Sequence, residues 1–220
     1  MGTVILARHS TTDASAAGRN LGRGSDPPLT DAGRLLARSL GETLVAELER
    51  IPADELRLVS SPARRCRETI AEVAAALGIA AERIETEAGL LEIDYGAWDG
   101  LSPEECEARD PQLRAAWIAD PYLTRCPAGE SGSDVAARSL PVLDAIDGWA
   151  REDRARCAIV VAHNHVNRIR LCHLLGYPMR EYRERVVQDP AGYSMLGIGS
   201  GPIAIRRINA PAAPGVGGGD

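Results

Sequence analysis

Near its N-terminal end the chain carries the stretch that decides its fold, TVILARHS at residues 3–10. Residues 3–7 form an apolar run rich in β-branched side chains, which predicts a buried strand. Arg8 and His9 follow directly, so they stand at the rim of the sheet where this strand ends. A neutral imidazole is a competent nucleophile, and an arginine binds anionic oxygens. Taken alone, however, the pair favours a structural histidine that ties the next loop to the strand.

Beyond this stretch, the chain alternates strands with helices. Apolar runs predict further strands at residues 56–59, 84–87 and 158–161, and a closing hairpin from 195–198 and 203–208. Helical periodicity predicts helices at residues 30–50, 62–77, 102–109, 111–119, 133–150 and 166–175, with Thr30 as an N-cap. Residues 8–29 and 89–100 are predicted loops. This alternation predicts an α/β protein whose sheet is largely parallel and covered by helices on both faces.

Polar clusters follow three of the predicted strands. The first is Arg8 with His9, the second is SSPARR at residues 60–65, and the third is HNHVNR at residues 163–168. Because α/β sheets bind ligands at the carboxyl ends of their strands, we expect the three clusters on one rim. Hydroxyls and arginines at a helix start suit an anion, although a solvated arginine pair explains the second cluster equally well. His163, taken alone, also favours a structural role.

The segment LEIDYGAWDG at residues 91–100 places acidic side chains among apolar and aromatic ones. A partly buried carboxylic acid such as Glu92 has a raised pKa and can donate a proton to a leaving oxygen. The alternative is a loop whose acids face the solvent.

The histidines do not predict a metal site. His165 and His173 are eight positions apart on one predicted helix, two turns away from each other and too distant to share an ion with His163. No Asp or Glu lies between residues 163 and 173 to complete such a site. We therefore expect no metal ion from this pattern.

The composition excludes several classes of protein. The formal net charge is -6 and the basic residues form no long run, so a nucleic-acid binder is disfavoured. All 25 basic residues are arginine, which suits phosphate recognition but also follows from genome composition. The 5 cysteines show no CxxC spacing, which indicates reduced thiols in a cytoplasmic protein. No signal peptide is evident, no apolar run is long enough to span a membrane, and residues 210–220 are expected to form a disordered tail.

Taken in order, these segments resemble the histidine phosphatase superfamily, also called phosphoglycerate-mutase-like. The resemblance covers about residues 3–208 and rests on Arg8 with His9, PLTDAGR at 28–34, SSP at 60–62 with Arg65, Glu92 before GAWDG at 96–100, GES at 129–131, and VAH at 161–163. It implies a three-layer α/β/α sandwich with a mostly parallel sheet. It also implies a single domain over residues 1–209, with a helical cap inserted at about residues 89–131.

The resemblance also implies roles for five residues and no cofactor. His9 would be the nucleophile that becomes phosphorylated. Arg8, Arg65 and His163 would form the phosphate pocket and stabilise the charge of the transition state. Glu92 would protonate the leaving group and then activate the water that hydrolyses the phosphohistidine.

This sequence departs from the family pattern around the expected pocket. Ser10 and Asn164 stand where glycine is usual, Thr11 replaces an acidic residue, Ser15 replaces an asparagine, and Arg23-Gly24 replaces a glutamine-glycine pair. We expect the specificity of substrate binding to depend on these departures. The predicted binding set is therefore Arg8, Ser10, Ser15, Arg23, Arg65 and Asn164, extended by His165 or Asn167.

The resemblance favours a phosphomonoesterase that acts on a small metabolite, such as a sugar phosphate, a nucleoside phosphate or a biosynthetic intermediate. A phosphomutase with the same nucleophile is the first alternative, but family mutases usually have a longer chain and a more enclosing cap. A non-catalytic binder of a phospho-ligand is the second alternative, suggested by Ser10 and Asn164. The expected partner is a small phosphomonoester, with no nucleic acid and no membrane. The oligomeric state stays open, although a homodimer is common in the family.

Overall fold

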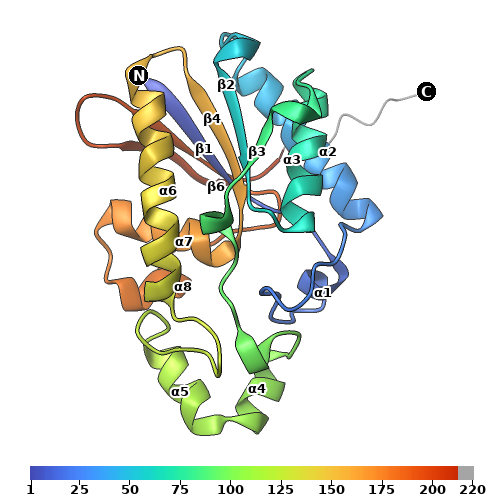
Figure 1. Ribbon diagram of the computed structural model, residues 1–220, viewed down its shortest axis with the longest axis vertical. Helices are drawn as coiled ribbons and strands as arrows, with labels where there is room; N and C mark the ends of the chain where they lie inside the picture. Colours follow the sequence, from blue (N-terminus) through green and yellow to red (C-terminus); the bar gives the residue numbers. More distant parts are fainter. Residues whose placement is uncertain (213–220) are drawn as a thin grey trace.

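A computed structural model describes residues 1–212, which form a six-stranded sheet with the order β3-β2-β4-β1-β5-β6 (Figure 1). The four strands from β3 to β1 are mutually parallel, whereas β5 and β6 are antiparallel to their neighbours. The predicted largely parallel sheet is therefore confirmed, with the predicted hairpin closing one side. The strands are β1 Gly2–Arg8, β2 Leu56–Ser60, β3 Ile84–Thr86, β4 Cys157–Ala162, β5 Tyr193–Ile198 and β6 Ala204–Ala210.

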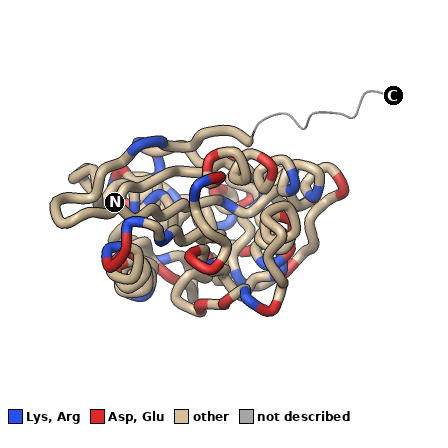
Figure 2. The backbone as a smooth tube through the Cα atoms, turned by 90° about the horizontal axis from the view of Figure 1, so that it is seen from above, with Lys and Arg blue, Asp and Glu red and all other residues tan. Residues whose placement is uncertain are grey.

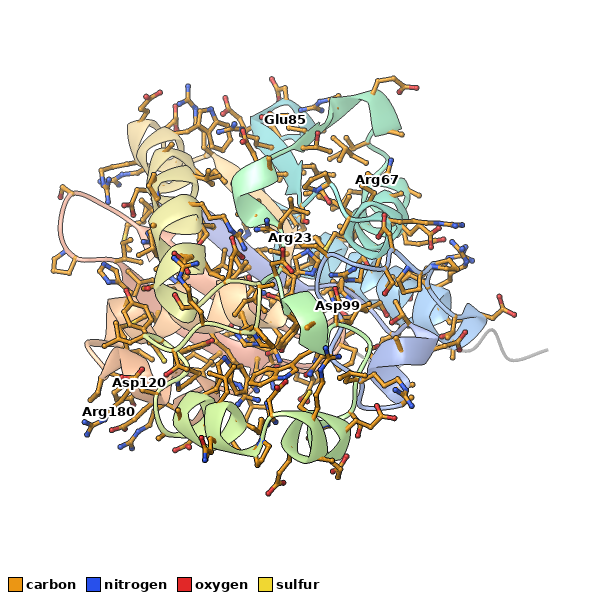
Figure 3. All side chains as sticks on the ribbon, turned by 60° about the horizontal axis from the view of Figure 1, so that its bottom comes forward. Arg23, Arg67, Glu85, Asp99, Asp120 and Arg180 are labelled. Carbon is orange, nitrogen blue, oxygen red and sulfur yellow. The ribbon has the colours of Figure 1, made fainter. Side chains whose placement is uncertain are left out.

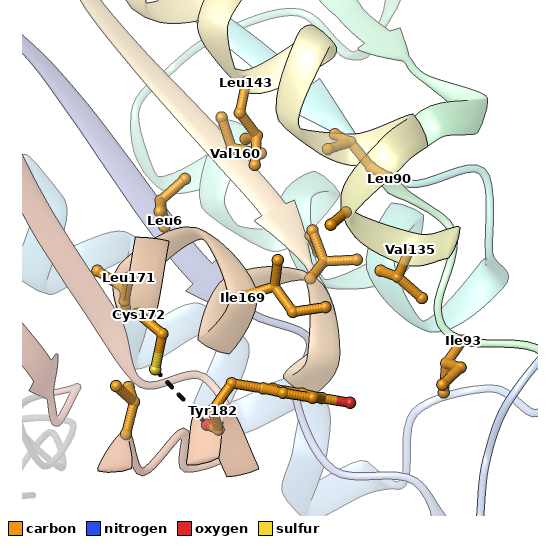
Figure 4. Close-up of a cluster of buried hydrophobic side chains, with 14 of the residues drawn as sticks. Leu6, Leu90, Ile93, Val135, Leu143, Val160, Ile169, Leu171, Cys172 and Tyr182 are labelled. Carbon is orange, nitrogen blue, oxygen red and sulfur yellow. Dashed lines mark hydrogen bonds between the residues drawn. The ribbon is translucent and has the colours of Figure 1, made fainter. Parts of the chain in front are cut away.

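Helices cover both faces of the sheet, which confirms the three-layer α/β/α architecture. Because successive side chains of a strand point to opposite faces, Val4 and Leu6 of β1 pack toward α6 and α7, whereas Ile5 and Ala7 pack toward α2 and α3. Figure 4 shows the first of these two cores, in which Leu6 and Val160 lie near α6 and α7. The helices are α1 Asp13–Ala16, α2 Asp31–Glu47, α3 Arg64–Ala76, α4 Pro103–Arg109, α5 Pro111–Ala119, α6 Gly132–Glu152, α7 Asn164–Leu175 and α8 Tyr182–Arg185.

The observed elements differ from the predicted ones mainly where helices are short. The predicted loop 8–29 contains α1, which Thr12 and Ser15 start with a reciprocal capping box. Helix α3 begins at Arg64, so Pro62 precedes the helix instead of lying in its first turn. Thr30 caps α2 as predicted, its side chain accepting a hydrogen bond from the Gly33 amide. Strand β6 includes Ala210, and the expected tail beyond residue 212 lies outside the described residues.

The segment between β3 and α6 leaves the sheet and carries α4 and α5. These two helices lie beyond the end of the sheet at which β1 finishes (Figure 1). Trp98 and Trp117 are fully buried in it, with ring centroids 6.0 Å apart in an edge-to-face arrangement. The Trp98 indole N–H donates to Asp110 Oδ2 at 2.7 Å. These two tryptophans therefore form the core of the segment, and the segment lies over the carboxyl ends of the strands.

Acidic and basic residues are interspersed along the chain (Figure 2). Many form surface pairs, such as Arg57 with Glu85 at 2.7 Å. Within residues 1–212, no helix combines the length and the apolar character needed to cross a membrane.

Candidate active site

The ends of β1, β2 and β4 bring the three polar clusters together. The His9 amide donates to the Ala162 carbonyl at 2.9 Å, and the Ser61 amide donates to the Val161 carbonyl at 3.0 Å. The rings of His9 and His163 have centroids 5.3 Å apart. The parallel register thus places His9 and His163, which are far apart in the sequence, side by side on one rim.

His9 is held with one ring nitrogen free. Its Nδ1 lies 2.7 Å from the Ser10 carbonyl oxygen. A carbonyl can only accept a hydrogen bond, so Nδ1 carries the proton and Nε2 keeps its lone pair. Burial lowers the pKa of His9 well below its usual value, and the positive charges of Arg65 and Arg8 lower it further. The imidazole is therefore neutral and its Nε2 is nucleophilic.

Two arginines flank this imidazole, the half-buried Arg8 and the fully buried Arg65. Arg8 donates from Nη1 to the Gln188 carbonyl at 2.7 Å, and Arg65 donates from Nη2 to the Gly22 carbonyl at 3.0 Å. Arg65 Nη1 also lies 3.8 Å from the half-exposed Asp26. Among the described residues, neither Arg8 Nε nor Arg65 Nε has a hydrogen-bond acceptor, although both atoms are buried. A buried donor without an acceptor costs about 1–3 kcal/mol, so both arginines favour an anion at the rim.

His163 completes the polar rim. Arg65 Nη2 donates to its Nδ1 at 3.2 Å, so Nε2 carries the proton and faces the Ser61 hydroxyl at 2.8 Å. Burial and then the charge of Arg65 lower the pKa of His163 well below its usual value. Both histidines of the rim are therefore neutral, and the arginines supply its positive charge.

Glu92 is a buried carboxyl on the same cavity as His9. Its Oε1 accepts from the Ile93 amide at 2.9 Å, and its Oε2 accepts from the His165 amide at 3.3 Å. Burial raises the pKa of Glu92 and outweighs these hydrogen bonds and the charge of Arg65, which lower it. Glu92 and His9 line a cavity of about 210 Å³. A carboxyl with a raised pKa and a neutral imidazole thus face one space in which a phosphate ester can lie between them.

A charged network fixes the backbone of Glu92. Arg23 Nε and Arg138 Nη2 both donate to the Glu92 carbonyl, at 3.0 and 2.9 Å. Glu130 accepts from both arginines at 2.9–3.1 Å. Arg23, predicted to bind substrate, therefore has its guanidinium engaged by protein groups, and Figure 3 shows it near the centre of this end of the molecule. Arg138 was not singled out from the sequence, because nothing local marks its contacts with the distant residues Gly89 to Glu92.

The other predicted binding residues lie in different surroundings. Ser10 is fully buried and its hydroxyl donates to the Gly33 carbonyl at 2.7 Å, away from the cavity lining. Ser15 and Asn164 line the cavity, and Asn164 Oδ1 is buried without a donor among the described residues. His165 also lines it, with its ring between the hydroxyls of Tyr95 and Tyr182, and Asn167 donates to Gln188 instead.

Three further basic residues that the sequence did not point out line the cavity, namely Arg19, Arg114 and Arg183. Arg19 follows α1 and pairs with Glu105, whereas Arg114 and Arg183 come from α5 and α8, where neither a strand end nor a motif marks them. Within residues 1–212, no group of three or more His, Cys, Asp or Glu side chains is arranged to hold a metal ion.

Comparison with known proteins identifies relatives over nearly the whole chain. The family profile described as histidine phosphatase superfamily (branch 1) matches residues 4–211. Phosphoserine phosphatase 1 of Hydrogenobacter thermophilus is 29% identical over 210 residues, which cover 94% of this chain and 91% of that protein. Glucosyl-3-phosphoglycerate phosphatase of Mycolicibacterium vanbaalenii is 32% identical over 181 residues, covering 80% and 75%. Some relatives are longer, and the chain spans only 34% of a matching bifunctional protein of Mycobacterium tuberculosis.

A solved structure agrees with these matches. The structure of a mycobacterial glucosyl-3-phosphoglycerate phosphatase complexed with VO3 superposes with a TM-score of 0.77 at 26% identity. The superposition covers 96% of this chain and 100% of the other. The similarity therefore extends over the sheet, its helices and the segment that carries α4 and α5.

Proposed function

The chain belongs to the histidine phosphatase superfamily, branch 1, and we propose that it is a phosphomonoesterase that works through a phosphohistidine on His9. Its matched relatives include a phosphoserine phosphatase and a glucosyl-3-phosphoglycerate phosphatase. These names support a small phosphorylated metabolite as the substrate.

In the first step, His9 Nε2 attacks phosphorus while the bond from phosphorus to the ester oxygen breaks. Arg8 and Arg65 bind the non-bridging oxygens, whose charge grows in the transition state. His163 joins them when its Nε2–H exchanges the Ser61 hydroxyl for a phosphate oxygen. Glu92 transfers its proton to the leaving oxygen, and the alcohol departs. The Ser10 carbonyl, bonded to Nδ1–H, stabilises the positive charge that His9 acquires when it becomes phosphorylated.

In the second step, the carboxylate of Glu92 takes a proton from water, and the resulting hydroxide oxygen attacks phosphorus. The bond between phosphorus and His9 Nε2 breaks, inorganic phosphate leaves, and both Glu92 and His9 return to their starting states. One carboxyl thus serves first as acid and then as base.

The observation that carries this proposal is the placement of two matched groups on one cavity. His9 presents a free Nε2 and Glu92 presents a buried carboxyl, and burial lowers the pKa of His9 and raises that of Glu92. Phosphoryl transfer needs a neutral imidazole and a proton on the carboxyl, and both pKa shifts act in that direction.

The proposal is tested with p-nitrophenyl phosphate as a generic substrate. We expect wild type to release nitrophenol and inorganic phosphate, and His9→Ala to lose at least about a thousandfold of kcat. His173→Ala serves as the control, because His173 is an exposed histidine on α7 outside the cavity. Acid-labile, base-stable phosphate bound to wild type after rapid quenching identifies the phosphohistidine. Equal activity of wild type and His9→Ala would refute the proposal, and an isomerised phosphate ester with no free phosphate would identify a mutase.

A further inference from the structure

The direction of the Arg65 side chain depends on a loop without regular structure. This loop, residues 21–26, is called the strap below and lies between α1 and α2. Arg65 Nη2 donates to the Gly22 carbonyl at 3.0 Å and, at 3.5 Å, to the carbonyl of the preceding residue. Its Nη1 lies 3.8 Å from Asp26 of the strap, and its partner outside the strap is His163. Within residues 1–212, the strap therefore supplies most of the polar contacts of this guanidinium.

Asp99 holds the backbone of the strap. The Gly22 amide donates to Asp99 Oδ1 at 3.0 Å, and the Gly24 amide donates to Asp99 Oδ2. Hydrogen bonds from amides to a carboxylate are stronger than those between neutral groups. Asp99 follows Trp98, which is fully buried in the core of the segment that carries α4 and α5. The carboxylate thus ties the strap to a rigid part of that segment, and we call this pair of bonds the Asp99 clamp.

The lack of side chains at Gly22 and Gly24 makes the clamp possible. A Cβ atom at Gly22 would lie 2.7 Å from the Ile93 carbonyl oxygen, and one at Gly24 would lie 2.7 Å from Asp99 Oδ2. Both distances are too short for a carbon atom, so a side chain at either position would push the strap and its neighbour apart. The sequence GRG at residues 22–24 therefore fits the carboxylate at position 99.

We propose that Asp99 is a positioning residue of the phosphate pocket, which acts through the strap on Arg65. This inference rests on the proposed function, in which Arg65 binds the phosphoryl oxygens. Asp99 is absent from the described residues that line the cavity with His9, so it acts through the strap and not on the substrate. Because a misplacement of about 1 Å in an active site can cost about a hundredfold in rate, a smaller shift of the strap should cost about tenfold.

The variant Asp99→Asn opens half of the clamp at almost constant size. An amide side chain has one acceptor oxygen and one NH2 group, so one of the two strap amides then faces a donor. We expect kcat/KM for p-nitrophenyl phosphate to fall about tenfold, and inhibition by orthovanadate, which probes the phosphate pocket, to weaken about tenfold. An unchanged kcat/KM would refute the proposal.

The matched control is Asp120→Asn. Asp120 is a half-buried carboxylate of the same segment and also accepts from two backbone amides, those of Tyr122 and Leu123, at 3.0 Å each. Both bonds go to Oδ1, so asparagine can keep both, and Figure 3 shows Asp120 well apart from Asp99. We expect this variant to keep kcat/KM within about twofold. A tenfold loss here as well would show a general loosening of the segment and overturn the proposal.

A double-mutant cycle with Arg65 distinguishes positioning from a general structural role. Arg65→Met removes the guanidinium but keeps a long, unbranched side chain. If Asp99 acts through Arg65, adding Asp99→Asn to Arg65→Met should lower kcat/KM by less than about twofold, although the same change costs about tenfold in wild type. A further tenfold loss in the double variant would show that the two residues act independently and would overturn the proposal.

The variant Gly24→Ala covers the case in which Asp99→Asn does not fold. The new Cβ meets the end of the Asp99 side chain, which can turn away, so the chain can fold while the clamp opens. We expect the same fall of about tenfold in kcat/KM, whereas Gly148→Ala, whose Cβ meets nothing within 4 Å, should keep wild-type activity. Wild-type kcat/KM in Gly24→Ala would refute the clamp and leave the hydrolase intact. By contrast, absence of any His9-dependent hydrolysis of p-nitrophenyl phosphate would refute the proposed function itself.

Discussion

Replacing Ser10 by alanine separates a structural role of its hydroxyl from a role in binding substrate. The hydroxyl donates to the Gly33 carbonyl at 2.7 Å, and the side chain is fully buried. Removal of one such neutral hydrogen bond costs about 1 kcal/mol of stability. For a domain of this size that loss lowers Tm by about 2–4 °C. Glycine at the same position also enlarges the conformational freedom of the unfolded chain, so Ser10→Gly should lose about a further 0.5–1 kcal/mol.

Urea unfolding and hydrolysis of p-nitrophenyl phosphate measure the two effects separately. We expect Ser10→Ala to lose stability by the amount above and to keep kcat and KM within about twofold, because the hydroxyl points away from the cavity. Ser200→Ala, in the exposed turn before β6, should change neither quantity. Unchanged stability together with a tenfold rise in KM would refute this reasoning and place the Ser10 hydroxyl on the substrate.

Two further predictions concern the protonation of the site. Because the reaction needs neutral His9 and protonated Glu92, the pH profile of kcat/KM should be bell-shaped. The pKa of His9 is lowered, so activity should be lost only below the usual histidine range, where His9 gains a proton. The pKa of Glu92 is raised, so activity should be lost above the usual carboxyl range, where Glu92 loses its proton. Glu92→Gln should abolish the alkaline limb together with most of kcat, and a variant that keeps both would contradict the acid assignment. Glu130→Gln removes the negative charge that pairs with both Arg23 and Arg138. Because these arginines hold the Glu92 backbone, kcat should fall about tenfold in steady-state kinetics. An unchanged kcat would show that the network does not position the acid.

The sequence predicts the rim well because each of its parts is local. An apolar run followed by a polar pair marks the end of β1 at Arg8, and the same pattern marks the end of β4 at His163. Parallel alternation of strands and helices then places these ends on one edge, as the His9–His163 contact shows. The assignment of Glu92 comes from the family resemblance. Glu92 lies in a segment that has no regular periodicity, so the local pattern does not predict its burial.

Contacts between distant residues explain what the sequence does not show. The direction of the Ser10 hydroxyl depends on α2, which packs against this loop only in the folded chain. Arg138 and Arg183 lie on helices, and a helical arginine is usually a solvated one. Neither the contacts of Arg138 with residues 89–92 nor the place of Arg183 in the cavity lining therefore has a local signature. The four-residue helices α1 and α8 are also too short to produce a hydrophobic period.

Burial is the largest cause of the opposite pKa shifts of the acid and the nucleophile. Removal from water disfavours the charged form of any group, so it lowers the pKa of His9 and raises that of Glu92. Mutual attraction between a histidinium and a carboxylate would shift both values the other way. The arginines add to the effect at His9 and oppose it at Glu92, where burial is still the larger influence. Exposing the cavity to water should therefore impair acid and nucleophile together, which makes the segment carrying α4 and α5 part of the chemistry of the site.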